Sequence, residues 1–340
     1  MALKPPVEVP QGAIRLNTDS QKLEFFAQDQ WWQMATDVPT LDGGARGLFQ
    51  GGSVPSPSSG TSTVDYITIP TEGNAIDFGD LTGTCFSGSG GASRTRSINA
   101  NGWRGSNSNV IDYGTIPSLG NYIDFGDSTY SSRYPGGFSN ATRQITVGGF
   151  ISGYDGTDTM DYITIASTGN AVDFGNLISG HDYNMCGSAS PTLGFIFGSD
   201  EGNSDYLNTI QFVTIATLGN AEDWGDLTTK GGAGRACSSP TRSVVGGGRN
   251  NSSSGISEMQ YINNSSKGDA TVFGHLQSDL KDLTGAVTDC IRGVWGGGAP
   301  GYTTEMSYTQ IATGGDAADF GDLTLGRSYG NGVSNAHGGL

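Results

Sequence analysis

The sequence predicts an all-β protein built from six copies of one repeat, and three observations carry this prediction. Two aromatic residues lie twelve positions apart six times, and successive copies begin 47, 49, 50, 49 and 47 residues apart. A glycine follows the first aromatic residue by seven positions in every copy. The chain also holds 56 glycines, which suit strands joined by tight turns. The pairs are Tyr66/Phe78, Tyr113/Phe125, Tyr162/Phe174, Phe212/Trp224, Tyr261/Phe273 and Tyr308/Phe320.

Composition and charge argue against two classes of function, nucleic-acid binding and membrane insertion. The chain has 340 residues and a formal net charge of −16 at pH 7, and no basic stripe is present to contact phosphates. Nucleic acid is therefore not an expected partner. No apolar run approaches the roughly 20 residues of a membrane helix, and residues 2–6 do not begin a signal peptide. We expect a soluble protein without membrane insertion.

The first 37 residues fall outside the repeat and form a predicted docking segment. Residues 1–11 are proline-rich, which predicts an extended arm. Two alternating runs then flank a polar turn at residues 17–21, which predicts a β-hairpin, and a third short strand passes through Trp31 and Trp32. An isolated hairpin is marginal in water, so this one needs a partner surface. The predicted docking residues are Ile14, Leu16, Leu23, Phe25, Phe26, Trp31 and Trp32.

Residues 12–34 contain the start Gly12-Ala-Ile-Arg-Leu-Asn-Thr-Asp19, the run Leu23-Glu-Phe25, and Gln30-Trp31. In these features the segment resembles a short module of tail fibres and other virion proteins of tailed bacteriophages. The resemblance implies that this segment attaches the protein to a phage particle. The alternative is that its apolar residues form a local staple beneath the repeat domain.

Residues 38–340 form the predicted repeat domain. A strand that opens with arginine or leucine runs into glycines, a loop leads to the tyrosine strand, and a Gly-Asn or Gly-Asp turn precedes an Asp-Phe-Gly-Asp strand. This order resembles the kelch repeat, although phenylalanine mostly replaces the usual tryptophan. The resemblance implies a six-bladed β-propeller of four-stranded blades. Residues 326–336 match an innermost strand, so we expect the C-terminal strand to close the first blade.

Loop positions identify the candidate ligand-binding face. The spacing varies mainly between the second and third strands of each blade, and these loops share one end of the disc with the connections between blades. Aromatic residues gather in both sets of loops. The candidate ligand-binding residues are Tyr130, Tyr134, Tyr154, Tyr183, Tyr206 and Tyr302.

The chemistry of the sequence favours a protein that is not an enzyme. The three histidines fall at unrelated repeat positions, no nucleophile motif has partners, and we expect no cofactor and no bound metal. The acidic residues of the Asp-Phe-Gly-Asp strands are expected to accept hydrogen bonds from turn amides or to pair with the repeated arginines. Cys85, Cys186, Cys237 and Cys290 lie in separate repeats, so we expect free, largely buried thiols.

These observations predict a virion protein, made in the host cytoplasm and present in many copies on a phage particle. The segment 1–37 would dock on other virion proteins, and the propeller would attach to a glycan or protein of the host surface. The alternative is a purely structural capsid or tail protein, whose propeller makes protein contacts alone. A carbohydrate-active enzyme is a third and more remote interpretation.

Overall fold

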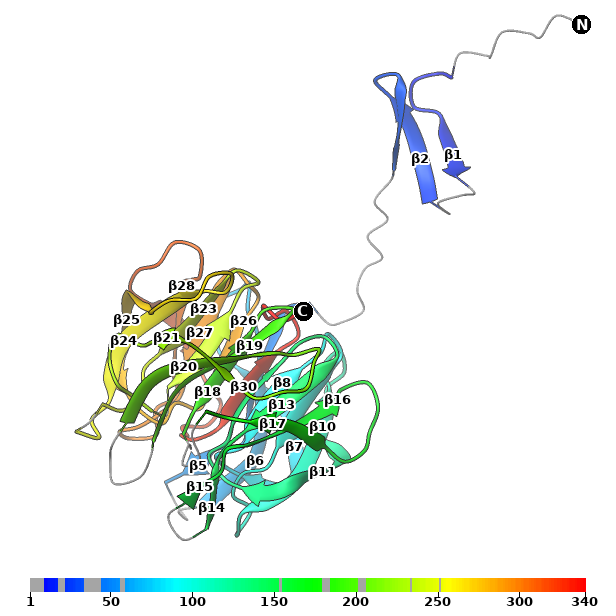
Figure 1. The fold of residues 1–340 in the computed structure, drawn as a ribbon. Coiled ribbons are helices and arrows are strands. Elements are labelled where there is room, and N and C mark those ends of the chain that lie inside the picture. Colours follow the sequence, from blue (N-terminus) through cyan, green and yellow to red (C-terminus); the bar gives the residue numbers. More distant parts are fainter. Residues whose placement is uncertain are drawn as a thin grey trace, which may run out of the picture. The chain divides into compact units, whose positions relative to one another are not determined.

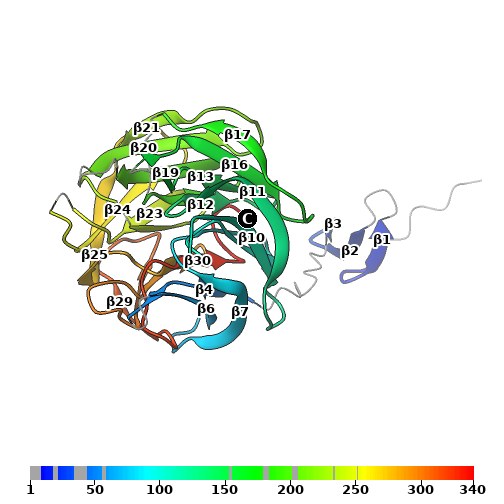
Figure 2. The ribbon, with the colours of Figure 1, turned by 90° about the horizontal axis from the view of Figure 1, so that it is seen from below.

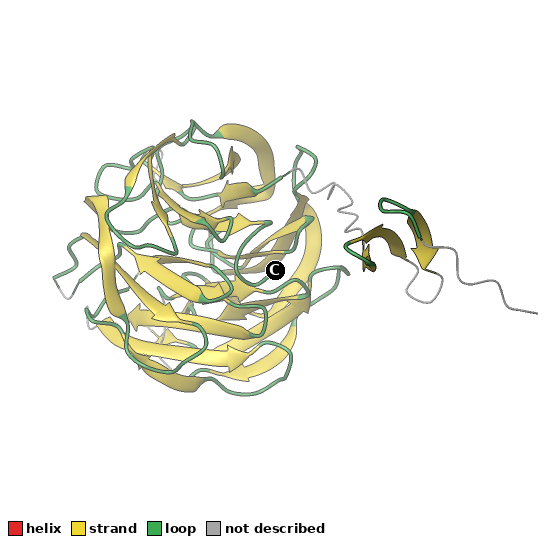
Figure 3. Ribbon diagram, turned by 90° about the horizontal axis from the view of Figure 1, so that it is seen from above, coloured by secondary structure: helices red, strands yellow, loops and turns green. Residues whose placement is uncertain are grey.

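The computed structural model describes residues 9–17, 22–33, 44–55, 59–152, 155–178, 184–200, 206–232, 234–250 and 252–340. The chain divides into two compact units, residues 1–41 and residues 42–340. Every regular element of the described residues is a β-strand (Figure 3). Most of the predicted arm, residues 1–8, lies outside the described part.

The N-terminal unit is a three-stranded antiparallel sheet. Its strands β1 (Ile14–Asn17), β2 (Lys22–Ala27) and β3 (Gln30–Gln33) follow one another in the sheet. Gln28 and Asp29 both have positive φ, 51° and 60°, which is the backbone of a two-residue turn between β2 and β3. The predicted hairpin with a third strand is therefore present.

The second unit consists of six four-stranded antiparallel sheets around a common axis (Figures 1 and 2). The β-propeller prediction is confirmed. From the axis outward, the first three blades are β30 (Asn331–Ser334), β4 (Arg46–Gln50), β6 (Ser59–Thr68) and β7 (Ile76–Cys85); β8 (Ser89–Ala92), β9 (Arg96–Ala100), β10 (Ser108–Thr115) and β11 (Ile123–Ser132); and β12 (Gly136–Ser139), β13 (Arg143–Val147), β16 (Thr159–Thr164) and β17 (Val172–Asn176).

The other three blades repeat the same order of strands. They are β18 (Cys186–Ala189), β19 (Leu193–Asp200), β20 (Tyr206–Thr214) and β21 (Glu222–Asp226); β22 (Arg235–Ser238), β23 (Arg242–Gly246), β24 (Ile256–Asn263) and β25 (Thr271–Leu280); and β26 (Gly285–Thr288), β27 (Arg292–Gly296), β28 (Glu305–Gln310) and β29 (Ala318–Asp322). Short strands extend two loops: β5 (Ser53–Val54) in the first blade, and β14 (Phe150–Ser152) with β15 (Asp155–Gly156) in the third.

The ring closes through the last strand, as the sequence predicts. β30 pairs with β4 in antiparallel register, with Val333 opposite Leu48. Each innermost strand contacts the next, and β30 contacts both β8 and β26. Glycine permits this approach near the axis: a Cβ on Gly332 would lie 2.5 Å from the carbonyl oxygen of Ala286.

The Gly-Asn and Gly-Asp turns join neighbouring blades at the outer rim. The amide of Gly120 donates to the carbonyl of Phe78 in the preceding blade at 2.9 Å, and the Asn121 side chain accepts from the Asp80 amide at 3.1 Å. The same pair of bonds links the last blade to the first, through Gly73 and Asn74. These repeated bonds explain the fixed turn seen in the sequence.

The aromatic pairs and the opening arginines fill the space between blades. Tyr66 and Phe78 meet edge to face with ring centroids 6.2 Å apart, and each of the other five pairs does the same. The guanidinium of Arg143 lies over the ring of Tyr162 and donates to the carbonyl of Ile215 in the next blade at 2.9 Å. Arg46, Arg96 and Arg242 behave alike, so the predicted pairing of these arginines with the strand aspartates is wrong.

Candidate functional site

One end of the propeller, here called the loop face, carries both the loops between second and third strands and the connections between blades. On this face, the residue after the Gly-Gly or Asn-Gly pair that ends a second strand forms an isolated antiparallel β-bridge with a segment leading to an innermost strand. The described bridges are Ser53 with Ser328, Trp103 with Phe86, Phe150 with Arg133, Arg249 with Gly232, and Ala299 with Lys281. The repeat therefore places one such pair above each of five blades.

The residue that follows each connecting segment lies at the mouth of the central channel. Ser87, Tyr134, Asn184, Asp282 and Tyr329 all have φ between 54° and 59°, a backbone that non-glycine residues rarely adopt. Their main chains are linked in sequence around the axis: the amides of Asn184, Tyr134, Ser87 and Tyr329 donate to the carbonyls of Tyr134, Ser87, Tyr329 and Asp282 at 2.6 to 2.9 Å. Their side chains are thus held at a shared rim, here called the channel mouth.

An aromatic surface adjoins the channel mouth over the first three blades. Arg133 lies with its guanidinium 4.9 Å from the ring centroid of Trp103, 4.5 Å from that of Phe150 and 5.6 Å from that of Tyr134. Trp103 also packs on Phe86, and Tyr134 meets Tyr329 edge to face at 5.5 Å. All six side chains are half-buried, so each keeps part of its surface open to solvent. We call Phe86, Trp103, Arg133, Tyr134, Phe150 and Tyr329 the aromatic surface.

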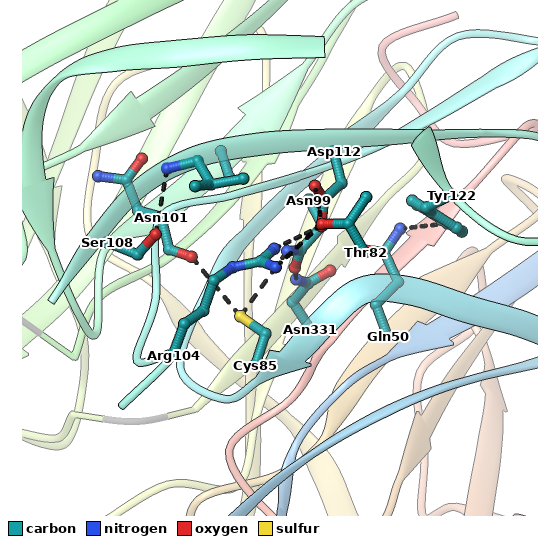
Figure 4. A network of polar contacts seen from close by, with 12 residues as sticks. Gln50, Thr82, Cys85, Asn99, Asn101, Arg104, Ser108, Asp112, Tyr122 and Asn331 are labelled. Carbon is teal, nitrogen blue, oxygen red and sulfur yellow. Dashed lines mark hydrogen bonds and ion pairs between the residues drawn. The ribbon is translucent and has the colours of Figure 1, made fainter. Parts of the chain in front are cut away.

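A buried polar network holds the loop that carries Trp103 (Figure 4). The neighbouring Arg104 forms an ion pair with Asp112 and donates to Thr82 of the first blade at 3.3 Å. Asp112 is fully buried and also accepts from Thr82 at 2.6 Å. On the other side of the loop, Asn107 donates to the carbonyl of Phe150 at 3.0 Å. These contacts fix Trp103 and Phe150 relative to each other.

A second charged group adjoins the aromatic surface at Tyr329. Arg249 makes two hydrogen bonds of 2.7 Å to the carboxylate of Asp282 and also donates to the hydroxyl of Tyr329. Burial disfavours the charge of Arg249, but the hydrogen bonds and charge of Asp282 outweigh burial and raise the pKa of the guanidinium. Burial, followed by the charge of Asp282, raises the pKa of Tyr329. Arg249 is therefore charged at neutral pH, and Tyr329 is protonated.

Of the six predicted ligand-binding tyrosines, Tyr134 lies in the aromatic surface. Tyr206 is 1% exposed, so it cannot present its ring to a ligand as expected. Tyr130 donates its hydroxyl to the carbonyl of Gly148 at 2.9 Å, and burial raises its pKa well above the usual value, which is the behaviour of a structural side chain. Tyr302 is half-buried on the loop face, and its described contacts do not include the aromatic surface. Tyr154 and Tyr183 lie outside the described residues.

The sequence prediction missed Trp103, Phe150, Arg133 and Arg249. Trp103, Phe150 and Arg249 share one repeat position, directly after the paired glycines or Asn-Gly, where the other copies carry serine or alanine. Large side chains at a position that is otherwise small were the available signal. Arg133 could be found only from the fold, because its bridge partner Phe150 lies 17 positions away.

The docking residues of the N-terminal sheet divide between its two faces. Ile14, Leu16, Leu23, Phe25 and Trp32 share one face, because Ile14 lies opposite Phe25, Leu16 opposite Leu23, and Phe25 opposite Trp32. These five side chains are 37% to 63% exposed. Phe26 and Trp31 instead pack on each other on the opposite face, where Arg15 covers Trp31 and pairs with Glu24. The open apolar face is therefore made of five of the seven predicted residues.

The cysteines are free thiols, as predicted. Cys85, Cys186 and Cys237 are buried, whereas Cys290 is half-exposed. Burial raises the pKa of Cys186 to about 12 and that of Cys290 to about 11, so both stay protonated at neutral pH. Within the described ranges, no three His, Cys, Asp or Glu side chains gather in a metal-binding arrangement. The same ranges contain no helix able to span a membrane.

Comparison with known proteins supports the fold. No family model and no curated protein matches the sequence. Among solved structures, the propeller superposes on YjhT, a kelch-repeat β-propeller protein, with a TM-score of 0.59 over 73% of this chain and 87% of that chain. The chain is similar in fold to YjhT. Because the two share 8% sequence identity, the likeness to YjhT shows the fold alone.

Proposed function

We propose that this chain is a non-enzymatic attachment protein of a tailed-phage virion, whose propeller contacts a glycan or protein of the host surface. The observation that carries the proposal is the aromatic surface beside the channel mouth. Aromatic rings offer apolar faces to the C–H groups of a sugar, while tyrosine hydroxyls and arginines offer hydrogen bonds. A site built on rigid blades also loses little conformational entropy on binding.

The N-terminal sheet supports the docking part of this proposal, in which the chain attaches to another virion protein. An apolar face of five exposed side chains on a three-stranded sheet is unfavourable in water, and burial against another virion protein would stabilise it. The opposite face is already covered by the contacts of Arg15, Phe26 and Trp31. The proposal therefore assigns Ile14, Leu16, Leu23, Phe25 and Trp32 to docking.

The placement in a phage particle rests on the resemblance of residues 12–34 to tail-fibre segments. The likeness to YjhT concerns the fold alone and does not bear on this placement. Many copies on one particle would strengthen weak single contacts through multivalency. The second candidate is a structural capsid or tail protein, and the exposed apolar face of the N-terminal sheet is the observation that favours it.

Two sets of variants test the proposal on assembled particles. Replacing Trp103 and Tyr134 together with alanine should lower host adsorption at least tenfold and leave particle assembly unchanged. Tyr302→Ala is the matched control, because Tyr302 lies on the same face and makes no described contact with the aromatic surface. Failed assembly of the Trp103/Tyr134 variant, with a folded propeller, would favour the structural alternative.

Deletion of residues 1–37 tests docking separately. The truncated chain should keep the melting temperature of its propeller and be absent from purified particles. Loading of the truncated chain at the level of the full chain would show that the N-terminal sheet is not the docking element.

A further inference from the structure

The interior of the channel directly behind the mouth holds a small cavity. Its volume is about 50 Å³, and every blade contributes to its wall. About 10 to 15 Å³ open to the centre of a water molecule is enough to hold one water, so the cavity has room for a group the size of a carboxylate, sulfate or phosphate. Each blade contributes to this wall, and one residue from each of the six is Ser89, Gly136, Cys186, Arg235, Ala286 or Asn331.

Arg235 is the charged side chain of this wall. It starts from β22 in the fifth blade, and its guanidinium donates to the carbonyls of Gly234 at 2.9 Å and Gly330 at 2.8 Å. Arginine has five N–H donors, so these two bonds leave donors for a ligand. Arg235 is half-buried, and no carboxylate of the described residues forms an ion pair with it. An anion in the cavity would therefore be its direct counter-ion.

The charges around the mouth favour an anion. Asp282 is the nearby carboxylate, but Arg249 already binds both of its oxygens. Arg133 lies among aromatic rings, and its Nε atom is buried without a hydrogen-bond partner. Directly around the mouth, Arg133, Arg235 and Arg249 therefore outnumber Asp282, although the net charge of the chain is −16. A positive site in an acidic protein attracts an anionic ligand selectively.

We propose that the channel mouth binds an anionic group, a carboxylate, sulfate or phosphate, through Arg235, and that the group belongs to an acidic sugar whose ring lies on the aromatic surface. The ring would contact Tyr134 and Trp103 while its charged group enters the cavity. The sugar half of this inference rests on the proposed attachment function, whereas the anion half stands without it.

Calorimetric titration of the purified full chain tests both halves. D-Glucuronate and D-glucose differ in the carboxylate, and inorganic phosphate serves as an anion without a sugar. Glucuronate should bind at least tenfold more tightly than glucose. Arg235→Met should weaken glucuronate binding by tenfold or more, consistent with hydrogen bonds to a charged group, and Arg235→Lys should weaken it less.

Controls separate binding from folding and from overall charge. Lys267→Gln removes the same charge from an exposed turn at the other end of the blades and should leave binding unchanged. Each variant should melt within a few degrees of the wild type. Trp103→Ala should weaken glucuronate binding and leave phosphate binding unchanged.

The possible results are distinct. Equal binding of glucuronate and glucose, or no effect of Arg235→Met in a folded variant, overturns the anion site. Phosphate binding that depends on Arg235, together with glucuronate binding no tighter than that of phosphate, keeps the anion half and overturns the sugar half. Normal particle adsorption by the Trp103/Tyr134 variant would refute the attachment function without affecting the anion result.

Discussion

The arginines that open four of the six blades, Arg46, Arg96, Arg143 and Arg242, tie each of these blades to its neighbour. The strand aspartates were expected to accept hydrogen bonds from turn amides or to pair with these arginines. In the sixth blade, Arg292 stacks on Tyr308 and pairs with Glu72 of the first blade at 3.5 Å. Each of the other four arginines instead stacks on the tyrosine of its own blade and reaches a carbonyl of the next. That contact depends on how blades stack, which no spacing reveals. In the fourth blade Leu193 replaces the arginine, and Lys267 of the fifth blade supplies the cation over Phe212 at 4.4 Å.

His337 predicts a pH dependence of stability. Its Nε2 donates to the carbonyl of Ala92 at 2.9 Å and its Nδ1 accepts from the Gly339 amide, so the ring is neutral. Burial lowers its pKa from 6.5 to about 4. Between these values the unfolded chain binds a proton and the folded chain does not. The free energy of unfolding should therefore fall by about 2 kcal/mol from pH 7.5 to pH 5 through this group.

Guanidinium denaturation of the wild type and of His337→Asn at the two pH values checks this expectation. Titration of carboxylates affects both proteins alike, so their difference isolates His337. An identical loss of stability in the variant would contradict the assignment of a neutral ring.

At the scale of elements, the strands were predictable and the loops were not. Strand positions follow from the aromatic pairs, the Gly-Asn turns and the opening arginines, because each has the same geometric task in every blade. The functional surface comes from residues that differ between blades, such as Trp103 and Phe150, and a repeat consensus conceals them. Tyr206 shows the converse error: it is aromatic and near a variable loop, yet it is buried at the start of β20.

Two glycines at the outer rim have similar backbone conformations but different steric surroundings, so their substitution measures the two effects on stability separately. Gly79 and Gly120 have φ of 143° and 148°, and alanine is strained at both. A Cβ on Gly79 would lie 2.6 Å from the main chain of Gly120, whereas a Cβ on Gly120 has no neighbour within 4 Å. Gly120→Ala should thus cost about 1 to 3 kcal/mol of unfolding free energy, and Gly79→Ala should cost more. Chemical denaturation measures both, and equal losses would show that the blade contact yields without cost.

For the whole molecule, closure of the ring depends on the segment just before β30. Arg327 and Asp65 form an ion pair of 3.0 Å with both side chains fully buried. Arg327 also donates to the carbonyls of Thr63 and Phe49, so the last segment of the chain is tied to two strands of the first blade. The sequence predicted the closing strand but not this buried pair, since Arg327 and Asp65 are 262 residues apart.

Arg327→Met should lower the free energy of unfolding by about 3 to 5 kcal/mol, because it leaves Asp65 buried without its partner. Lys267→Gln is the matched control, since the pair of Lys267 with Glu222 is exposed and such pairs contribute at most about 1 kcal/mol. Urea denaturation of the two variants measures the difference. Losses of similar size in the two variants would show that the ion pair of Arg327 with Asp65 does not stabilise the closed ring.

The pairing of β30 with β4 also determines when this protein can become native during synthesis. Arg46 leaves the ribosome long before Asn335, to which its amide is bonded at 2.8 Å. Until then the first blade lacks its innermost strand, and β4 presents an unpaired edge to other chains. Five blades can assemble as they emerge, but the ring becomes complete in one late step. A chain stopped before β30 keeps an open edge that chaperones or proteases can recognise, so full-length copies alone reach a closed disc.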